Sequence, residues 1–244
     1  MEQFRIKIAG HVAEVESLHI RSKAICRDFL SDGLPEFKIR LEQQDIDKER
    51  NIYTELYGDC TLWDSTLETF ALHALLSTKL IDYGSFMMHG AAVAYDSSAY
   101  VFSAKSGTGK TTHVLQWLKH LPGAKIINGD KPIITIGDDR QTTMVCGSPW
   151  GGKENYYTNI MVPLRSIVFM ERAEENSIKR IPFAEAFTSF LPQVFHPDDE
   201  EKMRQTLRLM QQLKHEVSFW HFQFNNFKED CFDVAYNALV RGAK

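Results

Sequence analysis

The segment 104–111, with the sequence Ala-Lys-Ser-Gly-Thr-Gly-Lys-Thr, contains the residue types that hold a phosphate chain. Glycines in such a loop let backbone N–H groups turn toward phosphate oxygens at the positive end of a helix dipole. Lys110 supplies a positive charge for the β- and γ-phosphates, and the Thr111 hydroxyl can bind Mg²⁺. The spacing predicts a P-loop that binds a nucleoside triphosphate through Ser106, Gly107, Thr108, Gly109, Lys110, Thr111 and Thr112.

An acid that could complete this site ends the short strand predicted at 126–130, with the sequence Ile-Ile-Asn-Gly-Asp. An acid at the end of a strand beside a P-loop is well placed to bind Mg²⁺. Asp130 is therefore predicted to be a metal ligand or a catalytic base. The alternative interpretation is that Asp130 opens a turn before Pro132.

A second candidate segment is the loop 147–155, which combines a tryptophan, two adjacent glycines, a lysine and an acid. Rigid scaffolds often present functional residues on such loops. Lys153 could neutralise charge on a transferring phosphoryl group, and Glu154 could orient a hydroxyl acceptor. The alternative is a tight hairpin with a solvated Lys-Glu pair. Arg165 and Arg172 are interpreted as ordinary surface charges.

The elements around the P-loop are an apolar strand before it and a helix over 110–121, which Pro122-Gly123 ends. Near-continuous apolar runs at 86–94 and 99–103 predict two buried strands joined by a tight turn. Further strands are predicted at 125–128, 133–136, 142–146, 166–170 and 217–224, with a hairpin turn at Asp138-Asp139-Arg140. Helices are predicted at 65–82, 182–195, 198–213 and 228–240.

The first 60 residues contain alternating stretches typical of half-buried strands at 4–8, 12–16 and 37–41, and a helix-like spacing at 20–30. The prediction is a mixed α/β protein with a small β-rich N-terminal subdomain over residues 1–62 and a catalytic-type core over 63–244.

The composition is typical of a globular protein and argues against two classes of binding protein. Of 244 residues, 43% are hydrophobic and 25% charged, as in an average globular protein, and the net charge of −4 argues against nucleic-acid or membrane-surface binding. The four cysteines form no C-x-x-C pair, and neither a signal sequence nor a bilayer-spanning run is visible. A cytoplasmic location is expected.

Three stretches of the chain, one of them in the motif itself, resemble HPr kinase/phosphorylase. They are residues 88–93 (Met-His-Gly-Ala-Ala-Val), 101–103 (Val-Phe-Ser) and 106–112 (Ser-Gly-Thr-Gly-Lys-Thr-Thr). The last of these stretches is also similar to ATP-dependent phosphoenolpyruvate carboxykinase. The resemblance implies a P-loop core of that type, with a mixed, largely antiparallel sheet, and ATP as the nucleotide. It also implies that His89 lies near the phosphates, whereas the residues alone are equally compatible with a hydrogen-bonded core histidine.

These families typically carry paired acids where this chain has Gly129 and Asp130. The expected function is an ATP- and Mg²⁺-dependent phosphotransferase that acts on a hydroxyl of a protein, a peptide or a small molecule. Asp130, His89, Lys110 and Glu154 are the predicted catalytic residues, and Thr111 and Asp130 the predicted metal ligands. The alternative, supported by Gly129 in place of an acid, is a nucleotide-binding module without transfer activity. The sequence indicates neither the acceptor nor the oligomeric state.

Overall fold

The computed structural model describes residues 1–137 and 142–242, and the chain divides into two units between Tyr83 and Gly84. The predicted turn at Asp138-Asp139-Arg140 lies outside the described residues. The sequence placed the boundary after residue 62. In the structure α3 (Asp64–Leu80) belongs to the first unit instead, because it packs against α1 and α2 of that unit.

The first unit contains a three-stranded sheet in the order β1 (Glu2–Ile8), β2 (His11–Ser17) and β3 (Phe37–Arg40). β1 and β2 form an antiparallel hairpin, and β3 runs parallel to β2. Ala9 and Gly10 both have positive φ, as a two-residue hairpin turn of type I′ requires. The strands predicted in this region are present.

The helices of the first unit differ more from the prediction. The predicted helix 20–30 is divided into α1 (Ile20–Ile25) and a 3₁₀ turn, η1 (Arg27–Phe29). The fully buried Glu68 of α3 accepts hydrogen bonds from Leu18 N and Ser22 Oγ, so a distant acid holds the chain where it enters α1. After α3, a second 3₁₀ turn, η2 (Ile81–Tyr83), ends the unit.

One helix of this unit, α2 (Gln43–Tyr57), was not predicted. A capping box between Glu42 and Asp45 begins it, and Ile46 is its buried residue. A helix that buries so little lacks the wide apolar stripe by which helices are recognised in sequence.

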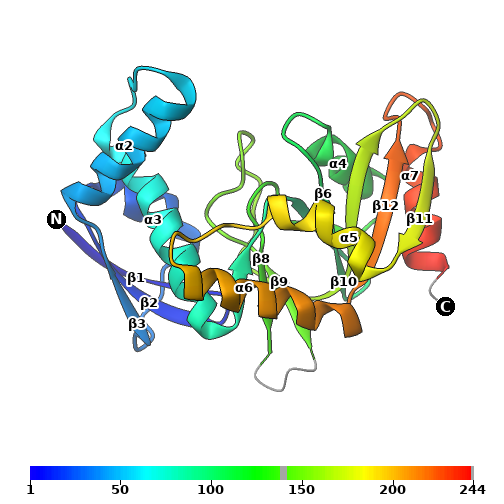
Figure 1. Cartoon of the computed structure of the whole chain (residues 1–244). Helices are drawn as coiled ribbons and strands as arrows, with labels where there is room; N and C mark the ends of the chain where they lie inside the picture. Colours follow the sequence, from blue (N-terminus) through cyan, green and yellow to red (C-terminus); the bar gives the residue numbers. More distant parts are fainter. Residues whose placement is uncertain (138–141, 243–244) are drawn as a thin grey trace. The chain divides into compact units, whose positions relative to one another are not determined.

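The second unit is built on a nine-stranded mixed sheet among the described residues (Figure 1). Along the main path the order is β4-β8-β9-β10-β6-β5-β7, and β12 pairs with both β10 and β11. β10 is parallel to β6 and to β12, whereas the other pairs are antiparallel. The bounds are β4 (Ser85–Met87), β5 (Ala91–Tyr95), β6 (Ser98–Ser103), β7 (Lys125–Asn128), β8 (Ile133–Ile136), β9 (Thr143–Cys146), β10 (Met161–Arg172), β11 (Ser177–Ile181) and β12 (Ser218–Phe224).

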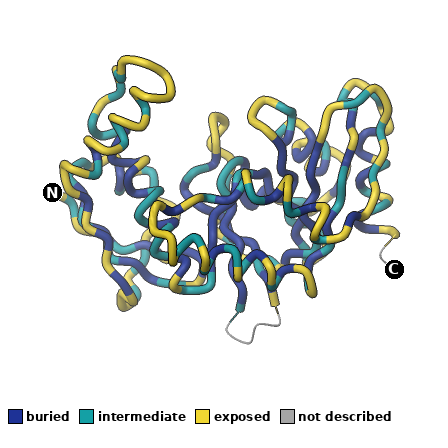
Figure 2. The backbone as a smooth tube through the Cα atoms, in the orientation of Figure 1, coloured by how far each residue is buried: buried dark blue, intermediate teal, exposed yellow. Residues whose placement is uncertain are grey.

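Helices cover both faces of this sheet, and Figure 2 shows its central strands as buried. Alternate residues of β10 point to opposite cores: Ile167 and Phe169 pack with α5 and α6, and Val168 and Met170 pack with α4 and α7. The helices are α4 (Lys110–His120), α5 (Phe183–Phe190) followed by η3 (Leu191–Gln193), α6 (Glu200–Gln212) followed by η4 (Leu213–His215), and α7 (Cys231–Tyr236) followed by a π-helical turn, η5 (Asn237–Arg241). Among the described residues, no helix has both the length and the apolar character to cross a bilayer.

The prediction of a mixed α/β protein with mixed sheets is confirmed. One correction concerns the run 86–94, which was predicted as a single strand. It is interrupted at 88–90 between β4 and β5, where Gly90 N donates to Asp130 O and His89 N donates to Gln193 O. This interruption takes His89 out of the sheet ladder. β11 was not predicted, because its exposed Lys179 and Arg180 obscure an apolar alternation.

Candidate functional site

The glycine loop, residues 104–111, joins the end of β6 to the start of α4. Gly107 and Gly109 have positive φ of 74° and 120°, which a residue with a side chain rarely adopts. Gly109 is the N-cap of α4, so the free N–H groups of the first helical turn lie at this loop. Ala104 has no positive φ and is accommodated without strain. A loop of this shape at a helix N-terminus favours an anion.

Lys110 lies beneath the loop rather than in solvent. Its Nζ donates to Ala104 O at 3.1 Å and to Lys105 O at 3.4 Å, and the residue is 6% exposed. Burial lowers the pKa of the Lys110 ammonium, and the attraction of Asp130 opposes that shift. A cation that is buried beneath the loop and held by backbone oxygens is ready to move to a stronger anionic partner.

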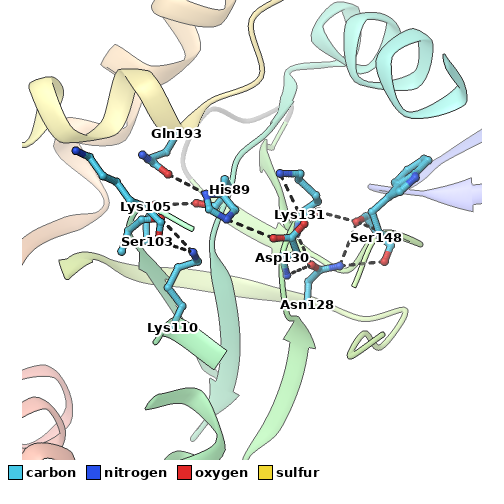
Figure 3. Close-up of polar contacts among 11 residues, drawn as sticks. His89, Ser103, Lys105, Lys110, Asn128, Asp130, Lys131, Ser148 and Gln193 are labelled. Carbon is cyan, nitrogen blue, oxygen red and sulfur yellow. Dashed lines mark hydrogen bonds and ion pairs between the residues drawn. The ribbon is translucent and has the colours of Figure 1, made fainter. Parts of the chain in front are cut away.

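His89 connects the glycine loop to Asp130 and to the end of α5–η3 (Figure 3). Its Nε2 lies 3.3 Å from Asp130 Oδ1, and its Nδ1 lies 3.0 Å from Gln193 Oε1. Ser103 Oγ, at the end of β6 immediately before the loop, donates to His89 O at 2.7 Å. Because the Gln193 amide carries both an acceptor and donors, it can partner His89 Nδ1 with or without a proton. The structure therefore brings His89, Asp130 and Lys110 into one region.

Asp130 is a half-buried carboxylate among positive groups. Burial would raise its pKa, but the hydrogen bond from His89 and the charges of Lys131, His89 and Lys110 together hold the pKa of Asp130 below its ordinary value. Its Oδ2 lies 3.6 Å from Lys131 Nζ. The carboxylate is therefore ionised at neutral pH, as a metal ligand or a base must be.

This lowered pKa predicts a specific dependence of stability on pH. The folded state binds the proton of Asp130 less tightly than the unfolded state, so its stabilising contribution is complete above the ordinary pKa, about 4, and is lost as pH falls through the lower folded value. The free energy of unfolding by urea, measured from neutral to acidic pH, is expected to show a gap between the parent and Asp130→Asn that shrinks on acidification. A gap that stays constant with pH would contradict this assignment.

The backbone around Asp130 is organised by the fully buried Asn128. Asn128 Oδ1 accepts from Asp130 N at 2.8 Å and from Lys131 N at 2.6 Å, and its Nδ2 donates to Ser148 O at 2.9 Å. Ser148 Oγ in turn donates to Lys131 O at 2.6 Å. Asn128 was not singled out in the sequence, although asparagine side chains commonly accept a hydrogen bond from the backbone N–H two residues on.

Gly129 is not an empty position that an acid could fill. A Cβ at Gly129 would lie 2.8 Å from Gly151 O and 3.3 Å from Tyr156 O, and Gly129 N donates to Tyr156 O at 2.7 Å. The loop 147–158 thus packs its backbone against this residue. The absence of a second acid follows from this close approach and is by itself no sign of a degenerate site.

Replacing Gly129 with alanine is expected to lower the free energy of unfolding by about 1–3 kcal/mol, because backbone atoms must shift to admit the methyl group. The sign of this change in the free energy of unfolding distinguishes a tightly packed position from a roomy one. Gly129 has no positive φ, so in a roomy position the same change would stabilise the protein by about 0.4–1 kcal/mol through the unfolded state. Urea unfolding of Gly129→Ala decides between the two, and stabilisation would contradict the close packing.

The loop 147–155 is a tight turn with its charged residues outside. Asn155 N donates to Gly152 O, and Tyr156 N donates to Gly151 O. Lys153 and Glu154 are exposed, and Glu154 has no hydrogen bond or ion pair within the described part of the chain. The role of Glu154 in orienting an acceptor stays a prediction.

A cavity of about 720 Å³ opens on the glycine loop. Lys105, Ser106, Gly107 and Thr108 line one side, and the end of β10 together with α5–η3 lines the other, through Arg172 and Gln193 among others. Arg172 is more than a surface charge, because its guanidinium donates to Gly107 O at 2.7 Å and to Thr108 O at 3.1 Å. Within the loop motif, Thr111 is half-buried in the first turn of α4, and Thr112 is exposed.

No family model and no curated protein matches the chain. Among solved structures, the chain is similar to the Hpr(Ser) kinase/phosphatase from Coxiella burnetii, with 10% sequence identity over 65% of this chain and 99% of that chain and a TM-score of 0.37. This is a resemblance in structure and does not establish family membership.

Proposed function

We propose that this protein is an ATP- and Mg²⁺-dependent phosphotransferase that uses the glycine loop as a P-loop. The observation that carries the proposal is the convergence of three groups around the glycine loop. These are a positive-φ glycine loop on a helix N-terminus, a buried lysine beneath it, and an ionised Asp130 paired with His89.

The loop supports binding of the phosphate chain. Its backbone N–H groups and the N-terminus of α4 provide donors and a favourable dipole for the β- and γ-phosphates. Lys110 would exchange its contacts with Ala104 O and Lys105 O for phosphate oxygens, which are stronger acceptors. ATP as the nucleotide follows from the sequence resemblance over residues 86–136 and is part of the proposal.

The donors around the loop fit Mg²⁺ as it is bound together with a nucleotide. Mg²⁺ usually takes one or two carboxylates and keeps its remaining positions for water and substrate phosphates. Thr111 and Asp130 supply a hydroxyl and a carboxylate that would hold it. Among the described residues, no cluster of three or more His, Cys, Asp or Glu side chains could hold a metal ion. The ion would accordingly arrive with the phosphates, whose charge it would help to neutralise.

The transfer itself requires mainly positioning and charge stabilisation. The hydroxyl oxygen of the acceptor attacks the γ-phosphorus, the bond to the β–γ bridging oxygen breaks, and ADP leaves. Asp130 accepts the hydroxyl proton as the general base, and His89 orients the Asp130 carboxylate through the 3.3 Å contact. Lys110 neutralises charge that develops on the transferring group.

A nucleotide-binding module without transfer activity is the second candidate. It is favoured by one observation: both oxygens of Asp130 already face a partner, His89 Nε2 on one side and Lys131 Nζ on the other. In that arrangement Asp130 would have to exchange a partner before it accepted a proton.

The experiment that tests the proposal is incubation of the purified protein with γ-labelled ATP, Mg²⁺ and fractionated cell extract. Labelling of a protein, peptide or small molecule that is absent with Lys110→Met supports the phosphotransferase. Tight nucleotide binding without any labelled product in any fraction supports the binding module instead.

A further inference from the structure

A chain of four polar side chains runs behind the glycine loop, on the α4 and α7 side of the sheet. Trp117 Nε1 donates to His113 Nε2 at 3.3 Å, His113 Nδ1 lies 3.8 Å from Cys231 Sγ, and Cys231 Sγ donates to Asn226 Oδ1 at 3.5 Å. Trp117 and His113 are fully buried, and Cys231 is buried as well. The chain ends at Asn226, in the turn between β12 and α7.

The direction of each hydrogen bond in this chain is fixed by chemistry. The indole N–H of Trp117 can only donate, so His113 Nε2 must be the unprotonated nitrogen. Burial lowers the pKa of His113 to about 3, so the ring is neutral and carries its single proton on Nδ1. That proton points to Cys231 Sγ.

The Cys231 thiol accepts one hydrogen bond of this chain and donates the next. Burial raises the pKa of Cys231 to about 11, so the thiol keeps its hydrogen at neutral pH. With its sulfur accepting from His113, the S–H group is left to donate to Asn226 Oδ1. The carbonyl end of the Asn226 amide is therefore held toward Cys231, and its NH₂ end lies on the other side.

The NH₂ end lies against the glycine loop. A Cβ at Gly109, the N-cap of α4, would be 2.8 Å from Asn226 Nδ2, so this nitrogen occupies the space that a side chain at residue 109 would need. Within residues 1–137 and 142–242, Asn226 Nδ2 makes no hydrogen bond to a protein acceptor. An oriented donor without a protein partner thus stands beside the helix N-terminus that favours an anion.

We propose that Asn226 is a further ligand-binding residue of this site, whose NH₂ group donates to a phosphate oxygen of the bound nucleoside triphosphate. Cys231, His113 and Trp117 are positioning residues that keep the amide in this orientation. The inference rests on the proposed nucleotide binding and adds a contact that the P-loop motif does not contain.

Calorimetric titration with ATP and Mg²⁺ tests the contact. Asn226→Ala is expected to weaken binding about tenfold through the loss of one hydrogen bond. Asn226→Asp is expected to weaken it further, because a carboxylate would stand beside the phosphates. Parental affinity in both variants would overturn the contact. Absence of nucleotide binding by the unaltered protein would overturn the proposed function and this inference together, whereas binding that is unaffected by Asn226 changes overturns the inference alone.

The role of the thiol has its own test by rescue. Cys231→Ser retains a group that accepts and donates, so affinity is expected to stay within about twofold of the parent. Cys231→Ala removes the donor to Asn226 Oδ1 and is expected to weaken binding as Asn226→Ala does. Cys146→Ala, at another buried cysteine, controls for the cavity alone, and thermal unfolding confirms that each variant is folded. Equal affinity of the Ser and Ala variants of Cys231 would overturn the positioning role.

Nitrogen-15 NMR of the His113 ring provides a test that needs no nucleotide. The chain requires a neutral ring protonated at Nδ1, and this tautomer is expected between mildly acidic and neutral pH. A neutral ring protonated at Nε2 would overturn the direction of the whole chain.

Discussion

Lys110→Met is expected to weaken ATP binding by about 10- to 150-fold, which corresponds to about 1.5–3 kcal/mol for a hydrogen bond to a charged group. The reason lies in the position of the ammonium, which is buried beneath the glycine loop and held by Ala104 O and Lys105 O. Methionine fills similar volume but offers the phosphates neither a charge nor a donor. The measurement is calorimetric titration with ATP and Mg²⁺.

The same variant should remain folded. Burial lowers the pKa of Lys110, so the fold disfavours the charged ammonium, and its replacement by an apolar side chain relieves that unfavourable burial. A melting temperature close to or above that of the parent is expected. Lys119→Met, in the exposed last turn of the same helix, is the matched control and should leave affinity unchanged. A large fall in stability of Lys110→Met would show that the lysine serves the fold instead of the ligand.

Asp130→Asn is expected to lower the rate of phosphoryl transfer by about 10²- to 10⁴-fold, the usual contribution of a general base. The amide keeps the shape of the carboxylate but can neither accept the acceptor's proton nor orient His89 by charge. Binding of the nucleotide should change less than the rate, because Lys110 and the loop amides stay in place. Initial rates of product labelling at saturating ATP measure the effect.

Glu154→Gln is the companion variant, because Glu154 was predicted as a second group that could orient the acceptor. Glu154 is exposed on the loop 147–155, and the polar network around His89 reaches Asp130. If the rate of phosphoryl transfer falls in Asp130→Asn but not in Glu154→Gln, the general base is Asp130. A transfer rate of Asp130→Asn within twofold of the parent would contradict the assignment, and a large loss in Glu154→Gln would move the role to that residue.

Local patterns in the sequence were sufficient for much of the framework. The strand, glycine loop and helix around Lys110 follow from an apolar run, two glycines and a Pro-Gly stop, and β6 and α4 are present on either side. The hairpin between β5 and β6 turns at Asp96 and Ser97, both with positive φ, as a run of small polar residues suggests. These features depend on neighbours in sequence, and periodicity reveals them.

The supporting contacts of the site depend on residues far apart in sequence. Gln193 meets His89 across 104 positions, and Asn128 meets Ser148 across 20. No local spacing indicates such pairs. Gly129 was interpreted as a missing acid, although backbone oxygens of a later loop determine the residue there. Arg172 was interpreted as a surface charge for the same reason, since its contact with Gly107 O arises only when β10 lies beside β6.

The most direct test of the central claim is calorimetric titration of the purified protein with ATP in the presence of Mg²⁺, repeated with Lys110→Met. We expect binding of one nucleotide per chain to the parent and a loss of at least tenfold in affinity in the folded variant. Absence of binding by the parent, or equal affinity in both proteins, would contradict the claim that the glycine loop binds a nucleoside triphosphate.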